Sequence, residues 1–402
     1  MADIVELTIE RRASKQDIAA HPAQSKPAPM RDGALLPLTA IDENEWRRLA
    51  DRAIEPNAYY LPDWELAVNT SAQGRTGASA LAAWADSRLV GLMPVVPIWR
   101  ACKIPLPALV SAHPYGTLCT PMLDRECADS AATQLLHAAR KAGARALLLR
   151  EVALDGVSMK AVTEALRRDG LSPRILDAHV RASLDATCDA EALLREALGT
   201  KKLKELRRQR HRLAEHGALS FEVARSPGRV SSAIETFLTL EASGWKGKRG
   251  TALAQVEGDA IFIRRATRAL AENSQCEIVT LRAGETPVAS GIVLRHQRRA
   301  FFFKLGVDER FAKFSPGVQL TLELTRHLCS DSEIASADST ASPDHPMINP
   351  IWRDRFAIGD VLIPLEPNDP VVRLIHAALI AQKLARKAAR RAAHVIRSLK
   401  SR

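Results

Sequence analysis

The sequence predicts an α/β protein with a mixed α+β sheet, arranged as two similar halves and a basic helical tail. Helical and extended patterns alternate along the chain without a strict βα period. A chain of 402 residues exceeds one ordinary core, so two domains of about 150 to 200 residues are expected. A hairpin pattern recurs and aligns Asp86 with Gly284 and Val90 with Val288. This weak internal repeat favours two like halves, although two unrelated hairpins would also produce it.

The composition is that of a soluble globular protein, with 46% apolar and 26% charged residues. No apolar run reaches the roughly 20 residues that span a bilayer, and the amino terminus lacks the apolar core of a secretory signal. We therefore expect a cytoplasmic protein. The six cysteines are scattered without a CxxC pair, so neither a metal site nor a disulfide framework is expected.

The net charge of +11 is concentrated in one segment. Residues 371–402 hold nine Lys or Arg and no acid, which leaves 48 bases against 46 acids elsewhere. A nearly neutral body argues against a DNA-binding protein. The predicted tail, 367–402, is a basic amphipathic helix. It is either solvated or a contact for an anionic membrane surface or tRNA, and the membrane contact would place the protein peripherally on the inner membrane.

The amino-terminal part is predicted as a flexible leader over 1–33, followed by a first domain over 34–190. The leader lacks any apolar period. Apolar spacing, turn residues and terminating glycines then predict the elements of the first domain. In chain order these are a helix at 43–53, a hairpin of strands 79–84 and 89–96, a helix at 131–142, a strand at 146–149 and a helix at 158–168.

The second domain is predicted over 191–366 from the same kinds of pattern. Its elements in chain order are helices at 203–213 and 231–244, strands at 276–282, 288–295 and 300–307, a helix at 318–328 and a strand at 334–338. The first of these helices, with its lead-in, carries seven bases: Lys201, Lys202, Lys204, Arg207, Arg208, Arg210 and Arg212. They form either a rim that attracts phosphate or a solvated face.

A tight turn precedes the helix at 318–328. Ser315 and Gly317 flank Pro316 there, directly ahead of the unpaired amides of the first helical turn, and such a terminus attracts anions. Gly317 has no Cβ to keep a phosphate from the backbone, and Ser315 can cap the helix or donate to a ligand. We expect these residues, with the flanking Phe314 and Val318, to bind a cofactor. An ordinary capped helix is the alternative.

Three further residues are candidate catalytic bases. Glu241 lies on the apolar stripe of its helix, where desolvation would raise its pKa, unless its carboxylate reaches water. Asp338 closes a predicted strand and His345 lies in the loop that follows, which is where reactive groups gather in open α/β sheets. A loop histidine that only forms a hydrogen bond is the alternative for His345.

Several other catalytic classes find no support. The chain contains no GxGxxG, no GxxxxGK[ST], no GxSxG and no HExxH pattern. Dinucleotide-binding, phosphate-loop, serine hydrolase and zinc protease functions are therefore not expected.

Four segments carry a resemblance to a known family. Residues 204–217, 240–252 with its Trp-Lys-Gly element, 314–317 and Asp338 resemble the GNAT-type acetyltransferase domain of the CelD/BcsL cellulose-biosynthesis family. That family is similar to the Fem aminoacyltransferases, which pair two GNAT-like folds in one chain. Residues 55–60 resemble the amino-terminal GNAT-like half less specifically. The resemblance implies two tandem GNAT-like folds.

The same resemblance implies acyl transfer from acetyl-CoA or another acyl-CoA to a sugar, a polysaccharide precursor or a small metabolite. The thioester would enter between strands 300–307 and 334–338, and Glu241, Asp338 or His345 would remove the acceptor's proton. No covalent intermediate on the enzyme is implied. No metal is implied either.

Trp245, Lys246 and Lys304 are expected to bind substrate. A tyrosine often protonates the thiolate in GNAT enzymes, yet Tyr59, Tyr60 and Tyr115 all lie in the first half. The resemblance leaves two alternatives to acyl-CoA transfer. One is an aminoacyl-tRNA-dependent transferase of the Fem kind, and the other is a non-catalytic partner in exopolysaccharide or cellulose biosynthesis.

Overall fold

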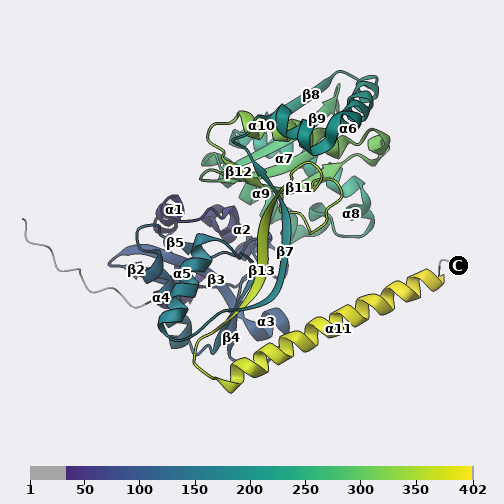
Figure 1. Ribbon diagram of the computed structural model, residues 1–402. Helices are drawn as coiled ribbons and strands as arrows, with labels where there is room; N and C mark the ends of the chain where they lie inside the picture. The colour runs from purple at the N-terminus through teal and green to yellow at the C-terminus, as the bar shows by residue number, and fades with distance from the viewer. Residues whose placement is uncertain (1–32, 401–402) are drawn as a thin grey trace, which may run out of the picture.

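The computed structural model describes residues 33–400, with side chains described as far as residue 389. Two lobes are joined by long strands, and a helix projects from the lower lobe (Figure 1). The predicted leader lies outside the described residues except for Gly33. One sheet runs through both lobes in the order β1-β2-β3-β4-β6-β13-β7-β12-β11-β10-β9-β8.

The first half of the chain forms the lower lobe of Figure 1. Its elements are β1 (Ala34–Pro37), α1 (Glu43–Arg52), α2 (Pro62–Ser71), β2 (Ser79–Ala85), β3 (Arg88–Pro97), α3 (Ile98–Cys102), β4 (Ala108–Ser111), β5 (Met122–Leu123), α4 (Ala128–Lys141), β6 (Ala146–Ala153), α5 (Val157–Arg168) and β7 (Arg174–Asp185), with short 3-10 turns at Leu38–Ala40 and Ala58–Tyr60.

The second half forms the upper lobe. Its elements are α6 (Ala190–Ala214), β8 (Leu219–Ala224), α7 (Pro227–Ser243), α8 (Trp245–Lys248), α9 (Glu257–Glu272), β9 (Cys276–Ala283), β10 (Thr286–His296), β11 (Arg299–Val307), α10 (Pro316–Ser330), β12 (Ser336–Asp338), β13 (Asp354–Pro364) and the tail helix α11 (Pro370–Lys400), with 3-10 turns at Leu253–Gln255 and Glu309–Phe314.

The two lobes repeat one strand order. In the lower lobe β1 to β4 pair antiparallel in sequence and β4 then pairs parallel with β6; in the upper lobe β8 to β11 do the same and β11 pairs parallel with β12. The hairpin turns that suggested the repeat also match, because Asp86 has φ 56° and Gly284 has φ 57°. The predicted mixed α/β sheet with two like halves is confirmed.

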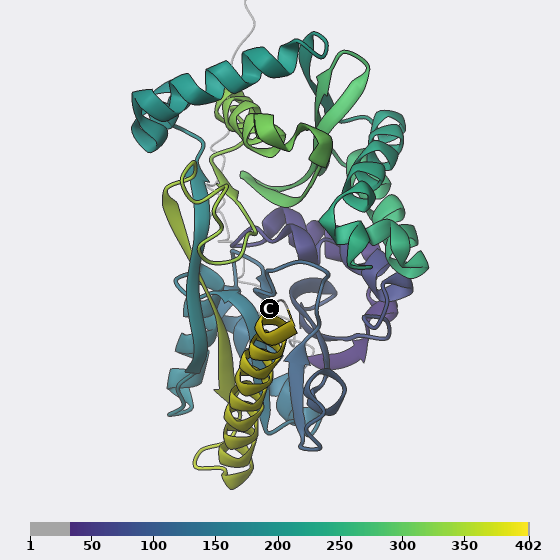
Figure 2. The same cartoon turned by 90° about the vertical axis from the view of Figure 1, so that its right-hand side faces the viewer.

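The two lobes exchange their last strands. β7 follows the lower-lobe elements but pairs with β12, whereas β13 follows the upper-lobe elements but pairs with β6. β7 and β13 also pair with each other antiparallel, so they form the connection between the lobes (Figure 2). The domain boundary at residue 190 stays a prediction. A division there would separate two strand repeats, each of which receives one strand from the other half of the chain.

Most predicted elements are present within a few residues of their expected ends. The helix expected at 203–213 extends back to Ala190, with a break at Gly199 where φ is 67°. Six strands were not predicted: β1, β4, β5, β7, β8 and β13. β7 alternates apolar and polar residues over 176–185 and β8 over 219–223, so the sequence contained this strand pattern but it was missed.

The lobes also meet through packed helices. α2 of the lower lobe lies against α9 of the upper lobe, where Trp64 meets Phe262 edge to face with ring centroids 5.0 Å apart. Trp64 meets Phe303 of β11 in the same way at 4.9 Å. This aromatic contact fixes the lower lobe beside the end of β11.

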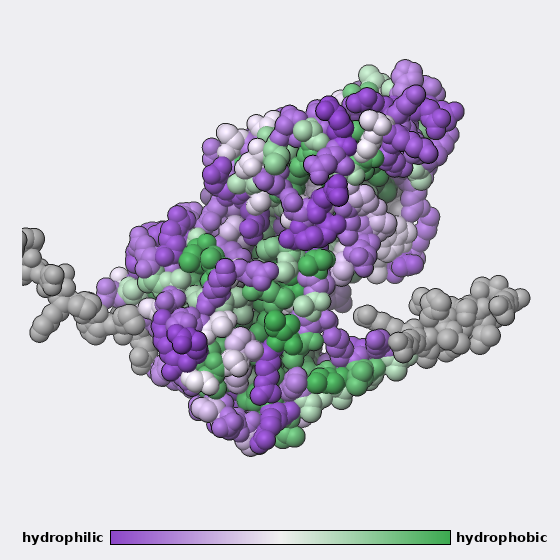
Figure 3. Space-filling view, in the orientation of Figure 1, coloured by the Kyte–Doolittle hydropathy of each residue, from purple (hydrophilic) through white to green (hydrophobic). Residues whose placement is uncertain are grey.

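The tail is the predicted basic helix, α11. Its first turns lie on the lower lobe through Val372 and Ile375, and Gln382 donates a hydrogen bond to the Cys102 carbonyl at 2.7 Å. Figure 3 shows apolar residues along this base of the helix. Leu374 and Leu384 are exposed. Within residues 33–400, no helix has the length and apolarity needed to cross a bilayer.

Candidate active site

The candidate site begins where β11 and β12 separate. The two strands pair parallel over only three positions, from Arg299 with Ser336 to Phe301 with Asp338. Beyond that point β11 stays paired with β10 but no longer with β12, and Thr340 holds the following loop by donating to the Phe302 carbonyl at 2.7 Å. The residues of β11 just past the separation therefore face an opening in the sheet.

Three of the predicted residues meet at this opening. Glu241 of α7 accepts hydrogen bonds from Lys246 Nζ at 3.0 Å and from Lys304 Nζ at 3.3 Å through one carboxylate oxygen. Its other oxygen accepts from the Leu253 amide at 2.9 Å. Gly306 allows this approach, because a Cβ there would lie 3.0 Å from the Glu241 amide nitrogen. Glu241 is buried on the apolar stripe of its helix, as predicted.

The predicted raised pKa of Glu241 is wrong. Burial alone would raise the pKa of this carboxyl, but Lys304, Lys246 and the Leu253 amide together lower it below its usual value. Glu241 is therefore an ionised anchor for two lysines. Burial lowers the pKa of Lys304, an effect that Glu241 opposes.

The lower lobe contributes Tyr115 to this cluster. Lys304 Nζ lies 5.9 Å from the Tyr115 ring centroid and 5.7 Å from that of Phe303. Tyr115 Oη donates to Asp259 Oδ2 at 2.7 Å, and the other Asp259 oxygen accepts from the Gln73 amide at 2.9 Å. Burial and the Asp259 carboxylate raise the pKa of Tyr115, so its hydroxyl keeps its proton.

Sequence reasoning missed the placement of Tyr115 and the role of Asp259. The sequence placed all three tyrosines in the first half and left open whether any of them reaches the site, which depends on how the lobes pack. Tyr59 and Tyr60 are fully buried in the aromatic core of the lower lobe. Tyr115 has a strained backbone, with φ 53°, a conformation that non-glycine residues adopt rarely and often at functional sites.

Asp338 lies apart from the lysine cluster. It closes β12 as predicted, but both carboxylate oxygens bind Arg181 of β7, at 2.7 Å to Nε and 2.5 Å to a terminal nitrogen. Both side chains are 1% exposed. Arg181 also donates to the Thr117 carbonyl at 2.7 Å, so this ion pair joins β12 to a loop of the lower lobe.

Trp245 and His345 lie nearer the surface. The Trp245 ring is exposed, its amide donates to Glu309 Oε1 at 2.6 Å, and Arg249 lies over the ring. His345 is in the loop after β12, where burial lowers its pKa and Nδ1 accepts from the Met347 amide at 3.4 Å. The His345 imidazole is therefore mainly neutral near pH 7.

The amino terminus of α10 is more closely packed than expected. Ser315 adopts the left-handed conformation and its side chain makes no capping hydrogen bond. Gly317 is buried, and a Cβ there would lie 3.0 Å from Leu305 and 3.2 Å from Met347. Phe314 is buried beneath Lys313, and Val318 is half-buried. The space beside Gly317 is thus filled by protein, and Ser315, which is half-buried between the buried Phe314 and Pro316, is the accessible residue at the start of α10.

The basic helix α6 lies along α10. Gln319 donates its side-chain amide to the Leu206 carbonyl at 2.9 Å, and Arg210 pairs with Glu323 at 2.9 Å. Lys202 pairs with Glu205 on α6 itself. The other cations of the stretch are exposed: Lys201, Lys204, Arg207, Arg208 and Arg212. A strip of positive charge therefore accompanies the helix whose amino terminus was predicted to bind phosphate.

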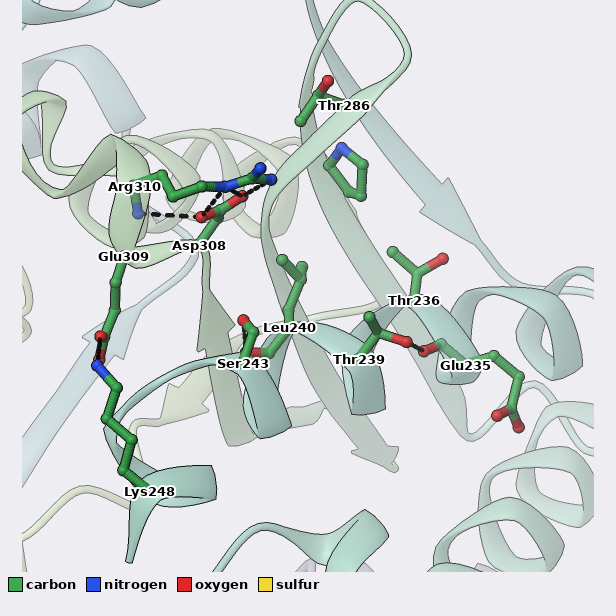
Figure 4. A pocket seen from close by; sticks show the side chains of 11 residues that line it. Glu235, Thr236, Thr239, Leu240, Ser243, Lys248, Thr286, Asp308, Glu309 and Arg310 are labelled. Carbon is green, nitrogen blue, oxygen red and sulfur yellow. Dashed lines mark hydrogen bonds and ion pairs between the residues drawn. The ribbon is translucent and has the colours of Figure 1, made fainter.

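A separate hollow of about 800 Å³ lies beside α7 (Figure 4). Its charged side chains are already paired, Arg310 with Asp308 at 2.7 Å and Lys248 with Glu309 at 2.7 Å. Neither Glu241 nor Lys304 lines it. The Lys304 cluster, and not this hollow, is therefore the candidate reaction centre. No group of three or more His, Cys, Asp and Glu side chains in the described part could hold a metal ion.

Comparisons with known proteins identify the type of domain and the fold. Residues 200–344 match a family model described as an acetyltransferase (GNAT) domain, so the chain carries a GNAT acetyltransferase domain and is an acyltransferase by that domain. No curated protein sequence matches the chain.

Three solved structures share the fold over 84% of this chain. They are FemX (11% identity, 98% of that chain, TM-score 0.55), the C-terminal domain assigned to a lysylphosphatidylglycerol synthetase of Agrobacterium fabrum (15%, 95%, 0.52) and L-PGS of Bacillus licheniformis (12%, 96%, 0.50). At these identities the likeness concerns the fold alone.

Proposed function

We propose that the protein transfers an acetyl or other acyl group from acyl-CoA to an amine or hydroxyl of a sugar, a polysaccharide precursor or a small metabolite. The observation that carries this proposal is Lys304, a largely buried cation just beyond the separation of β11 and β12. A buried ammonium group at an opening in a sheet is suited to stabilise negative charge that develops on a substrate.

Lys304 has the role of stabilising the tetrahedral oxyanion. Glu241 holds one side of its ammonium group and Tyr115 and Phe303 border it, so the group is oriented before substrate binds. Lys246 shares the same carboxylate and reaches the Leu305 carbonyl at 3.5 Å, which places a second cation at the mouth. In this scheme Glu241 is a positioning residue, because it acts through the two lysines.

The two proton transfers of the reaction are assigned to groups from different lobes. Tyr115 is the tyrosine that lies beside Lys304, and we assign its hydroxyl, oriented by Asp259, as the proton donor to the departing thiolate. Of the three candidate bases, Glu241 and Asp338 are occupied by cations, whereas His345 is neutral and no described residue is bonded to its Nε2. We assign His345 as the base that accepts the acceptor's proton, in direct attack without a covalent enzyme intermediate.

The test is acyl-CoA binding at the amino terminus of α10. In Ser315→Asp the new carboxylate would repel the CoA phosphates, yet aspartate tolerates the left-handed conformation and is a good helix cap. Ser315→Asn is the matched neutral control. We expect calorimetry to show acetyl-CoA or longer acyl-CoA binding to the wild type and to Ser315→Asn, and at least tenfold weaker binding to Ser315→Asp. Equal binding by both variants, or none by the wild type, contradicts the proposal.

A second candidate donor is aminoacyl-tRNA. The strip of exposed cations on α6 favours it, and the fold that the chain shares with FemX is consistent with it. Neutralising Lys201, Lys204, Arg207 and Arg208 to glutamine would then weaken tRNA binding and flatten its dependence on salt, because fewer counterions would be released. Fluorescence anisotropy with labelled tRNA at several salt concentrations measures both effects. Unchanged affinity and slope would contradict this donor.

The tail supports a further part of the proposal. Leu374, Ile380 and Leu384 are exposed on α11, and Lys383, Arg386 and Lys387 are exposed beside them. A helix of this kind is suited to lie on an anionic membrane surface. Sedimentation with phosphatidylglycerol vesicles, compared with vesicles of neutral lipid, tests this contact.

A further inference from the structure

The lower lobe has its own opening at the position equivalent to the candidate site. β4 and β6 pair parallel over three positions, ending at Val110 with Leu148, and then separate. A cavity of about 500 Å³ lies at this separation. Its walls come from β3, α3, the ends of β4 and β6 and the loops at 73–75 and 112–119. The two lobes thus open at matching places in their sheets, but only the upper opening belongs to the site proposed above.

Three arginines give the cavity its charge. Arg75 donates to His113 Nδ1 at 3.3 Å and to the Gln73 carbonyl at 3.0 Å. Arg100 donates to the carbonyls of the loop before β2, at 2.9 Å to Gly77. Neither guanidinium group pairs with a carboxylate among the ion pairs of the described residues, so both charges remain uncompensated.

The third arginine, Arg150, is only partly satisfied. Its Nε lies 3.1 Å from Asp360 Oδ2 but makes no hydrogen bond there, and this nitrogen is buried without a partner among the described residues. The one carboxylate in the wall is Glu151, whose pKa is raised by burial. The uncompensated positive charges of the lining are therefore those of Arg75 and Arg100, whereas Arg150 is ion-paired with Asp360 but its buried Nε makes no hydrogen bond to a described residue.

His113 is a further polar residue of the cavity wall. Burial, with Arg75 and Arg150 nearby, lowers the pKa of His113 to about 4, so the ring is neutral at pH 7 and does not add a fourth charge. The remaining lining includes small and apolar side chains such as Val96, Ala101 and Ala112. A few cationic groups in an otherwise mostly apolar cavity of this size are typical of a site for a small charged ligand.

We propose that this cavity is a second ligand site, which binds a phosphate-bearing small molecule of nucleotide or sugar-phosphate size. Guanidinium groups bind phosphate oxygens through paired hydrogen bonds, and Arg75, Arg100 and Arg150 approach the cavity from three different segments of the lobe. The inference depends on the lower lobe alone and not on the identity of the acyl donor.

The second site shares a wall with the reaction centre. The Arg75 guanidinium carbon lies 4.2 Å from the Tyr115 ring centroid, and Lys304 Nζ lies 5.9 Å from the same centroid. A ligand that binds Arg75 is therefore one side chain away from the group that stabilises the oxyanion. This position fits an acceptor whose phosphate is held in the lower lobe while its reactive group reaches the upper one.

The test uses inorganic pyrophosphate as the probe, at constant ionic strength set with sodium chloride. We expect calorimetry to show saturable binding to the wild type and at least tenfold weaker binding to both Arg100→Gln and Arg75→Gln. Arg268→Gln is the matched control, because Arg268 is an exposed arginine of α9 that pairs with Glu272 and does not line the cavity. Binding that is absent from the wild type, or weakened equally by Arg268→Gln, overturns the proposal.

Two further arms make the result specific. Arg100→Lys keeps the charge and the loop contact, so retained binding there, with an unchanged melting temperature, shows that loss in Arg100→Gln is not a folding defect. ADP and glucose 1-phosphate distinguish a nucleotide from a sugar-phosphate ligand.

Acetyl-CoA binding separates this proposal from the proposed function. Loss in Ser315→Asp with retention in Arg100→Gln supports two separate sites. Loss in Arg100→Gln with retention in Ser315→Asp means that the donor occupies the lower lobe, which contradicts both the donor placement and the second site as stated.

Discussion

The two openings in the sheet have the same strand order and different chemistry. At β4 and β6 the loop that follows leaves a cavity lined by arginines. At β11 and β12 the corresponding space holds Phe303 and Lys304, with Met347 packed beside Gly317. The backbone pattern thus provides an opening twice, and the side chains of the adjoining loops decide what each opening can bind.

The loop after β4 serves both openings. It runs along the cavity through His113 and Thr117, and it sends Tyr115 across to Lys304. Thr117 in turn accepts from Arg181, the partner of Asp338. The two openings are therefore not independent, because a single loop of the lower lobe carries groups that belong to each site.

The largest expected effect comes from breaking the ion pair that joins the two openings. Arg181→Met would leave the buried Asp338 carboxylate without a counter-ion, with only the Thr340 amide still donating to it among the described residues, which costs about 3 to 5 kcal/mol of unfolding free energy. Urea denaturation measures this loss. Arg326→Met is the control, since Arg326 pairs with Glu191 at the surface and should cost no more than about 1 kcal/mol. Similar losses in the two variants would mean that the buried pair has no special role.

The next largest expected effect is on catalysis at the upper opening, with ligand binding at the lower opening left intact. Lys304→Met should lower the rate of acyl-CoA cleavage by about 10³-fold, as the loss of an oxyanion-stabilising donor does. Release of free thiol measures the rate, and circular dichroism checks the fold. Pyrophosphate binding in the lower lobe should be unchanged. A variant that keeps more than a tenth of the wild-type rate would remove Lys304 from the reaction centre.

Much of this comparison could be predicted from the sequence. The hairpins, the helix after Gly317 and the stripe that buries Glu241 follow from periodicity and turn residues, which act over a few neighbours. The exchange of β7 and β13 could not be predicted, because their partners lie more than a hundred residues away. β7 itself alternates apolar and polar residues over 176–185 and was missed, whereas β13 shows no regular alternation.

Prediction of the candidate site from the sequence has the same limit. Glu241 was predicted from its helix, but the sign of its pKa shift depends on Lys246 and Lys304, which the fold brings from two other elements. Asp338 was predicted from the end of its strand, and its partner Arg181 comes from 157 residues earlier. Local patterns therefore located candidate groups, whereas long-range packing decided what each group does.

A smaller effect tests the shared loop. Tyr115→Phe removes the hydroxyl that is proposed to protonate the thiolate but keeps the ring beneath Arg75 and beside Lys304. We expect acyl-CoA cleavage to fall about 10²-fold, the low end for general acid catalysis because a thiolate leaves readily. Pyrophosphate binding should persist, since Arg75 contacts the ring and not the hydroxyl. An unchanged cleavage rate would assign the protonation to another group or to water.

The smallest effect compares two histidines, His296, which is buried, and His113, which is exposed at the cavity wall. Burial lowers the pKa of His113 in the cavity wall and of His296 at the lobe contact to about 4, from an ordinary value near 6.5. Because the unfolded chain binds these protons more readily, stability is complete above about pH 6.5 and falls as the pH decreases towards 4.

At pH 5 His296 should account for about 2 kcal/mol of lost unfolding free energy, and His113, which is exposed, for less because solvent screens its charge. Urea denaturation at pH 7.5 and pH 5 should therefore show a smaller loss in His113→Gln and in His296→Gln than in the wild type. Pyrophosphate distinguishes the two histidines. An anion beside His113 would stabilise the protonated ring and so reduce the loss of wild-type stability at pH 5. The pKa of His296 would not change, because its hydrogen-bond partners among the described residues are the Asn57 amide and the Ala50 carbonyl, away from the cavity. If pyrophosphate protected the His113→Gln variant as much as the wild type, the anion would bind away from the cavity wall.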